Sequence, residues 1–206
     1  LAIHALAAVA PVMELTSWAP MSTIFLNLLD RIEAVAEMED EWLVHQVRSA
    51  LHALRGDVMS QLGAFEDMQR AAESADQRIG VQIARFATLT IFAAGGAPIF
   101  DELLDAVAEM EGLDPTWGAI ARSHLALSAA YQGRLGLFDL VISEIDRGEV
   151  VLNSWGGRDL MEGMVCFARG DSVAASESFT SALASRYRPF GTTGIAESFL
   201  ALASAD

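Results

Sequence analysis

The chain contains no lysine, a single cysteine and no long apolar run. Its 13 basic residues are all arginine and stand against 28 acidic residues, which gives a net charge of −15. So acidic a surface repels phosphate groups, and we therefore expect neither direct nucleic-acid binding nor docking on anionic membranes. The longest apolar run, Ala5 to Met13, is interrupted by Pro11 and is well short of the roughly 20 residues that a membrane-spanning helix needs.

The single cysteine, Cys166, excludes an internal disulfide and a cysteine-rich zinc site, and it favours a reducing cytoplasm. It lies in the apolar stretch Met164 to Phe167, where a buried and unreactive thiol is expected. The chain also lacks a Gly-x-Ser-x-Gly nucleophile motif, and Gly95-Gly96 is not followed by the lysine of a phosphate-binding loop. We therefore expect no catalytic residue and no cofactor.

Histidine and carboxylate clusters offer little support for a metal site. His45 and His52 lie seven residues apart on one predicted helix, whereas metal ligands favour spacings such as i and i+4. Glu41 lies four residues before His45, so a weak carboxylate–imidazole pair could serve an enzyme, but a surface or groove histidine is the favoured interpretation. The acidic stripe from Asp101 to Glu109 follows an i, i+4, i+8 pattern and predicts a solvated helix face. No metal is expected.

Four glycines recur at nearly constant spacing. Gly56, Gly95, Gly133 and Gly170 lie 39, 38 and 37 residues apart, and each separates two stretches with helical patterning. A tight turn between two helices favours glycine, because glycine adopts positive φ without steric cost, and a following Asp or Ser can cap the next helix. The spacing therefore predicts a series of antiparallel helix hairpins.

The predicted fold is all-α: a right-handed superhelical stack of about five hairpins plus a terminal helix, in a single domain over 1–206. The expected helix pairs are 2–15 with 22–38, 41–55 with 57–75, 79–94 with 98–111, 117–132 with 135–147, and 158–169 with 171–187, followed by 194–204. The corresponding repeats span about 1–39, 40–77, 78–114, 115–152 and 153–190, with the terminal helix in 191–206. Only the short segment 148–152 has strand-like composition.

The fifth hairpin carries a complete packing pattern. Its positions, spaced 7, 5, 4 and 3 residues apart, are Gly163, Gly170, Ala175, Phe179 and Ala182. Small residues let two helices approach closely, and the aromatic ring fills the space beside them. The same frame gives apolar or weaker matches in the other hairpins: Gln61, Phe65 and Met68; Phe100, Leu104 and Val107; Phe138, Ile142 and Ile145.

This pattern resembles the tetratricopeptide repeat (TPR), in a degenerate form with a longer period. The segment Gly194 to Ala203 is similar to a helix that recurs in TPR-like arrays of large bacterial regulators, including LuxR-type and maltose-regulator-type ATPase-linked transcription factors. The missing initiator Met and the helical patterning up to both ends lead us to expect a fragment of a longer protein. The resemblance implies that any ATPase and DNA-binding parts of that protein lie outside this segment. It also implies a protein-interaction or sensor module, which would bind a protein, a peptide, a small inducer or other domains of the parent chain.

The first helices of such a stack line a concave surface. The residues expected on this surface, where a partner would bind, are Arg48, His52, Leu127, Leu160, Met164 and Phe167. Three tryptophans, Trp42, Trp117 and Trp155, stand near the starts of first helices, as packing anchors or as an aromatic rim. The alternatives to a binding role are a structural spacer or homodimerisation arm without a ligand and, less favoured, an α-helical enzyme.

Overall fold

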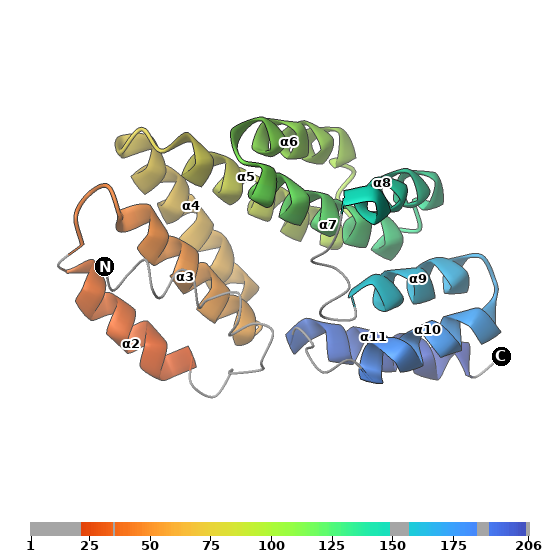
Figure 1. The fold of residues 1–206 in the computed structure, drawn as a ribbon. Coiled ribbons are helices and arrows are strands. Elements are labelled where there is room, and N and C mark those ends of the chain that lie inside the picture. The colour runs from red at the N-terminus through yellow and green to blue at the C-terminus, as the bar shows by residue number, and fades with distance from the viewer. Residues whose placement is uncertain (1–21, 35, 149–156, 185–189, 205–206) are drawn as a thin grey trace. The chain divides into compact units, whose positions relative to one another are not determined.

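The computed structural model describes residues 22–34, 36–148, 157–184 and 190–204 (Figure 1). Every regular element in these ranges is a helix, which confirms the all-α prediction at that level. The predicted helix 2–15, most of the strand-like segment 148–152 and Trp155 lie outside the described residues. No helix within the described ranges is long and apolar enough to cross a membrane.

The helix bounds follow the predicted hairpins closely. The helices are α2 (Ser22–Glu33), α3 (Glu41–Leu54), α4 (Val58–Ser74), α5 (Arg78–Ala94), α6 (Phe100–Leu113), α7 (Pro115–Tyr131), α8 (Leu135–Gly148), α9 (Gly157–Ala168), α10 (Ser172–Ala184) and α11 (Phe190–Ala203). The largest differences are an earlier end of α2, predicted to reach 38, and an earlier start of α11, predicted at 194. After α2 the chain closes into turns, in which the amides of Ala36 and Asp40 bond to carbonyls three residues back.

The chain divides into an N-terminal unit, Leu1–Leu89, and a C-terminal unit, Thr90–Asp206. In the N-terminal unit α2 packs on α3, and α3 packs on α4. In the C-terminal unit α6 packs on α7, α7 on α8, α9 on α10 and α10 on α11. The first helices of successive hairpins also touch here, because α9 contacts both α7 and α11. The helices of these pairs are therefore neighbours in space within each unit.

The turn inside each described hairpin has the same hydrogen-bonded form. Gly56, Gly133 and Gly170 have positive φ angles of 67, 66 and 80°, as the glycine spacing predicted. In each case the next residue's amide bonds to a carbonyl five residues back, which is the Schellman arrangement. The prediction was wrong by one residue in the third hairpin: Gly96, with φ of 88°, takes this role. Gly95 instead still donates to the Ile91 carbonyl, as a helical residue does.

The α4–α5 connection makes the same turn without glycine. Asp76 has a φ of 54°, and the Gln77 amide bonds to the Ala72 carbonyl five residues back. Aspartate is among the few residues that adopt this conformation at modest cost, so the sequence contains only a weak signal for the turn.

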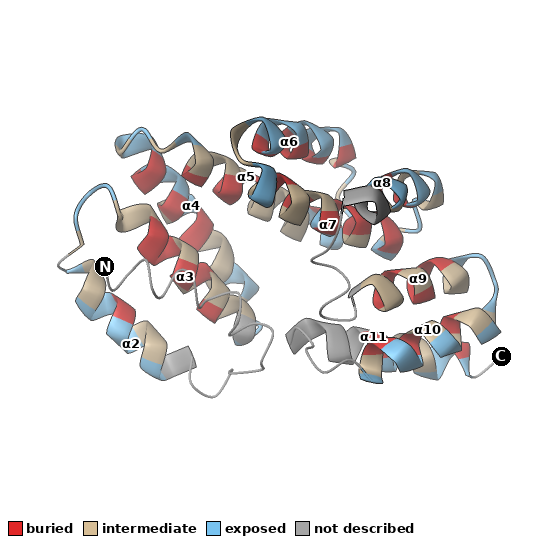
Figure 2. Cartoon of the chain, viewed as in Figure 1, coloured by how far each residue is buried: buried red, intermediate tan, exposed pale blue. Residues whose placement is uncertain are grey.

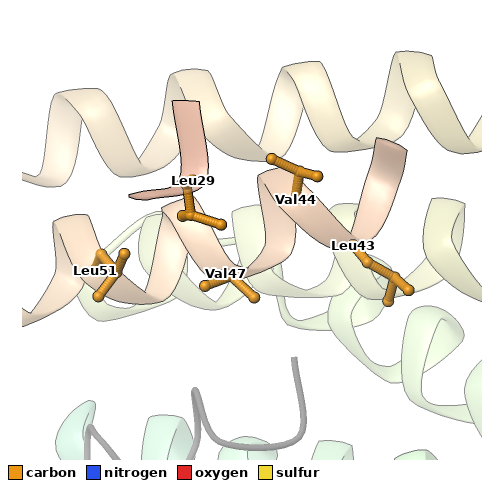
Figure 3. Packing of buried hydrophobic residues seen from close by; sticks show 5 residues of the cluster. All are labelled: Leu29, Leu43, Val44, Val47 and Leu51. Atoms are coloured by element: carbon orange, nitrogen blue, oxygen red, sulfur yellow. The ribbon is translucent and has the colours of Figure 1, made fainter. Parts of the chain in front are cut away.

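One hydrophobic cluster of the N-terminal unit lies between α2 and α3. Leu29 of α2 is fully buried against a stripe of α3 residues (Figure 3). That stripe consists of Leu43, Val44, Val47 and Leu51, at the three- and four-residue intervals that put side chains on one helix face. In α6 of the other unit, buried and exposed residues likewise divide into two faces (Figure 2). Hydrophobic patterning of this kind explains why the helices form and pack.

Glycines inside helices mark two close approaches. A Cβ on Gly80 of α5 would lie 2.9 Å from the Ala72 Cβ and from a Trp42 ring carbon. Trp42 therefore packs where three helices of the N-terminal unit meet, as expected of a packing anchor. A Cβ on Gly118 of α7 would lie 2.8 Å from the Glu111 Cα of α6. The close packing of α7 on α6 therefore also requires glycine at this position.

Candidate functional site

Arg48 is the centre of a charged cluster between α2 and α3. Its guanidinium donates to both carboxylate oxygens of Glu33, at 3.2 and 2.8 Å, and to Asp30 Oδ1 at 2.9 Å. The Arg48 side chain is only 16% exposed, whereas Asp30 is 67% exposed. The hydrogen bond and charge of Arg48 lower the pKa of Glu33 against the opposing effect of burial. Arg48, predicted to face a partner, therefore holds two helices together in this structure.

His45 lies one helical turn before Arg48 and is the most enclosed polar side chain of the cluster, with 8% of its surface exposed. It lines an open hollow of about 330 Å³ between α2, α3 and α4. The other lining residues are Glu33, Glu41, Asp67, Arg70, Ala71 and Ser74. Nε2 of His45 lies 3.8 Å from Glu33 Oε1 and 4.0 Å from Glu41 Oε1, beyond hydrogen-bond length. Glu41 and Glu33 thus both lie near the His45 ring without a hydrogen bond to it.

Arg48 also lies beside the imidazole ring of His45. Nη1 of Arg48 lies 3.4 Å from Nδ1 of His45. A guanidinium can only donate, so this contact is a hydrogen bond in the neutral tautomer that carries its hydrogen on Nε2. Desolvation and then the Arg48 charge lower the pKa of His45, while nearby carboxylates oppose this shift.

His52, the second predicted contact on α3, packs beside the α3–α4 turn. Its side chain is 16% exposed, and its Nδ1 is buried without a hydrogen-bond partner among the described residues. Asp57 Oδ2 lies 3.9 Å away. Burial lowers the pKa of His52, although Asp57 opposes the shift. Asp57 itself caps α4 by accepting from the Ser60 amide at 3.1 Å.

The predicted contact residues of the C-terminal unit differ in their accessibility. Leu160 and Met164 of α9 are 1% and 2% exposed, so both belong to the core and are closed to a partner in this structure. Leu127 of α7 and Phe167 of α9 are half-buried and remain accessible in part. Leu160 and Met164 are four residues apart on the α9 face that packs inside the unit.

An aromatic cluster joins α9, α10 and α11. A Cβ on Gly163 would lie 2.6 Å from a ring carbon of Phe179, which is fully buried. The Phe179 ring stacks on Phe199 of α11, with centroids 5.5 Å apart and planes at 25°. Phe199 also meets Phe167 edge to face, at 5.5 Å and 78°. The small-residue and aromatic pattern of the fifth hairpin thus corresponds to the contact of Gly163 with the Phe179 ring. Ala175 and Ala182, also part of the pattern, are buried.

The repeat frame is less accurate in α6. Leu104, placed at the aromatic position, is 38% exposed, whereas Leu103 is fully buried. Phe100 and Val107 are buried as the frame requires, and so are Phe65, Met68 and Phe138 in α4 and α8. Gln61 and Ile142 are half-buried, and the side chain of Ile145 lies outside the described set.

The described residues contain no group of three His, Cys, Asp or Glu side chains that could hold a metal ion. Asp101, Asp105 and Glu109 of α6 are all exposed, as predicted for a solvated stripe. Burial raises the pKa of the half-buried Cys166 thiol, which favours the unreactive protonated form.

Sequence reasoning missed Glu33, Asp30 and Phe199. Glu33 and Arg48 are 15 residues apart and in different helices, so no local spacing rule connects them. Phe199 lies in a segment noted only for its resemblance to a recurring helix. A helical wheel of α2, which puts Asp30 and Glu33 on one face, is the one signal that could have suggested a cationic partner.

No family model, curated protein or solved structure matches this chain.

Proposed function

We propose that this chain is a non-catalytic interaction module built as a TPR-like superhelical stack of helix hairpins. It would serve as the regulatory repeat region of a larger bacterial transcriptional regulator or signalling ATPase. The partner would be a protein, a peptide, a small inducer or another domain of the parent protein. The sequence resemblance supplies the regulator context, and the packing supplies the physical support.

The observation that carries the proposal is the packing of α9. This first helix touches α7 and α11 on either side as well as its own hairpin partner, α10. Stacking first helix on first helix is the arrangement that gives repeat arrays a continuous inner surface. The recurrent Schellman turns at Gly56, Gly96, Gly133 and Gly170 support a common repeat unit. A binding role suits this architecture because side chains of successive first helices combine into one surface.

Peptide selection tests the proposal. A random peptide library displayed on phage is selected against the full chain, and the enriched peptides are titrated while amide spectra are recorded. Replacing the half-buried Leu127 of α7 by Ala should weaken binding about tenfold if the first helices form the contact surface. The matched control is Leu140→Ala on α8, the second helix of the same hairpin, where the leucine is 60% exposed. The control should bind like the parent chain.

The outcomes separate the alternatives. Failure of any peptide to enrich, or an equal loss from both leucine variants, would overturn the binding role on this face. A concentration-dependent dimer seen by light scattering, without any response to peptide, would instead support the oligomerisation arm.

A further inference from the structure

The open hollow between α2, α3 and α4 is lined by more carboxylates than the neighbouring arginines neutralise. Each helix contributes one carboxylate: Glu33 of α2, Glu41 of α3 and Asp67 of α4. Arg48 donates to both carboxylate oxygens of Glu33, and Arg70 pairs with Asp67. In the part of the chain that the structure describes, no arginine lies within ion-pair distance of Glu41. The hollow therefore has one negative charge in excess, which attracts a cation from solution.

His45 adds a second kind of polar group to the wall of the hollow. Its side chain is only 8% exposed, and its Nε2 lies 3.8 Å from Glu33 Oε1 and 4.0 Å from Glu41 Oε1. Both distances are too long for a hydrogen bond, so Nε2 has no hydrogen-bond partner among the described residues. Since the ring and both carboxylates line the same hollow, this nitrogen faces it. A buried polar atom without a protein partner is satisfied by water or by a ligand.

The contact with Arg48 decides whether Nε2 of His45 donates or accepts. Nη1 of Arg48 lies 3.4 Å from Nδ1, and a guanidinium has only hydrogens to offer. In the neutral tautomer for which this contact is a hydrogen bond, the ring hydrogen is on Nε2, which then donates toward the hollow. The hollow therefore offers a charged acceptor, Glu41, and a donor, His45, only 4.0 Å apart.

We propose that this hollow binds the free amino terminus of a peptide chain. The terminal ammonium group would donate to Glu41 and to the Glu33 oxygen beside it, since an ammonium has three hydrogens. The carbonyl oxygen of the same terminal residue would accept from Nε2 of His45. Only the Cα and the carbonyl carbon separate that oxygen from the ammonium nitrogen, so one residue can reach both groups at once. Capture of a terminal amine is one of the recurring modes of peptide recognition.

The same geometry disfavours related ligands. A free amino acid would bring its own carboxylate against the carboxylates of the hollow. A lysine side chain has an ammonium group but no acceptor next to it, so Nε2 of His45 would lose its partner. An acetylated terminus has no charge for Glu41. The volume of about 330 Å³ is at the lower end of the roughly 300–1,000 Å³ range of ligand pockets and suits a terminal residue.

This site is separate from the first-helix surface under the proposed function. It is bounded by α2, α3 and α4 of the N-terminal unit, whereas that surface was argued from α7, α9 and α11. Either can fail while the other stands. The Leu127→Ala variant tells them apart, because it should bind amino-terminal probes as the parent chain does.

The test is a set of NMR titrations of the full chain at about pH 7, where an α-amino group is still largely protonated. Glycinamide carries both the ammonium and the carbonyl, ethylamine only the ammonium, N-acetylglycinamide only carbonyls, and glycine adds a carboxylate. Shifts of the His45 ring and of amides around the hollow report binding. Glycinamide should bind about fivefold more tightly than ethylamine. It should bind more than about tenfold more tightly than N-acetylglycinamide or glycine.

Variants assign the binding to its two groups. Glu41→Gln keeps the shape of the side chain and should weaken glycinamide binding about tenfold. Glu66→Gln is the matched control, because it removes the same charge from an exposed position of α4 outside the lining and should leave binding unchanged. His45→Leu should abolish the preference for glycinamide over ethylamine, since it removes the donor that distinguishes them.

Several results would overturn the proposal. Equal binding of glycinamide and ethylamine would mean that the hollow merely attracts cations, and equal effects of Glu41→Gln and Glu66→Gln would assign the binding to the overall charge. A chain that responds to no probe would have no such site. The probe comparison uses the unaltered chain, so it decides the question even where a variant does not fold.

Discussion

The α2–α3 junction and the α9–α10 hairpin are held together by different forces. At α2–α3, one guanidinium ties two carboxylates across the helices over a small apolar core. At α9–α10, a glycine lets a fully buried phenylalanine ring lie against the facing helix, and α11 covers the ring. The first depends on protonation and screening by salt, whereas the second depends on shape. One chain thus combines a contact based on charge with a contact based on shape.

The largest expected effect is at the centre of the aromatic cluster. Phe179→Ala removes a fully buried ring and leaves a cavity between α9 and α11, which should lower the free energy of unfolding by about 3–5 kcal/mol. Urea denaturation followed by circular dichroism measures the loss, and hydrogen exchange should place it in the C-terminal unit. Val173→Ala on the same helix, where the valine is 73% exposed, is the control and should change stability by less than about 0.5 kcal/mol. Similar losses from both variants would show that the ring is not the anchor.

A smaller effect is expected at Gly163, where the Phe179 ring leaves no room for a side chain. Gly163→Ala would put a Cβ 2.6 Å from the Phe179 ring and should cost about 1–3 kcal/mol through overpacking. Gly63→Ala in α4 is the matched helical control, because no atom lies within 4 Å of the added Cβ. It should instead stabilise the chain by about 0.5–1 kcal/mol. Urea denaturation should therefore show a loss of stability for Gly163→Ala and a gain for Gly63→Ala. A gain for Gly163→Ala would contradict the close contact.

The two regions also differ in how far the sequence could predict them. Gly163 and Phe179 stand in a repeated frame, and packing rules applied to that frame anticipate their contact. Gly56, Gly133 and Gly170 mark their turns because positive φ selects glycine. The same logic misplaced the third turn by one residue, since Gly95 and Gly96 are chemically equivalent candidates.

The charged cluster had no comparable sequence signal. Arg48 was expected on an open surface, but its carboxylate partners come from the neighbouring helix, 15 and 18 residues earlier. Ion pairs between helices follow from three-dimensional register rather than from any local period. Leu160 and Met164 were misplaced for a related reason: an apolar residue on a first helix suits a groove and a core equally well.

Removing the cluster's cation should have an intermediate effect. Arg48→Met keeps the aliphatic length but deprives Glu33 and Asp30 of their partner. The free energy of unfolding should fall by only about 1–2 kcal/mol, because water can solvate the exposed part of both carboxylates. The pKa of Glu33 and that of His45 should both rise, since Arg48 lowers each of them. NMR titration of both side chains reads this directly. An unchanged pKa at both positions would mean that the guanidinium does not lie between them.

The smallest effect is expected at an ion pair of similar geometry but greater exposure. Arg169 donates to both carboxylate oxygens of Asp139, at 3.0 and 2.8 Å, yet the two side chains are 46% and 55% exposed. Water and salt screen such a pair, so Arg169→Met should cost less than about 1 kcal/mol, and raising the salt concentration should remove most of that cost. The matched Arg48→Met variant should retain most of its larger loss at high salt. If salt changed the stability of both variants equally, burial would not distinguish the α2–α3 cluster from the Arg169–Asp139 pair. Arg48 would then attach α2 no more strongly than an ordinary surface ion pair does.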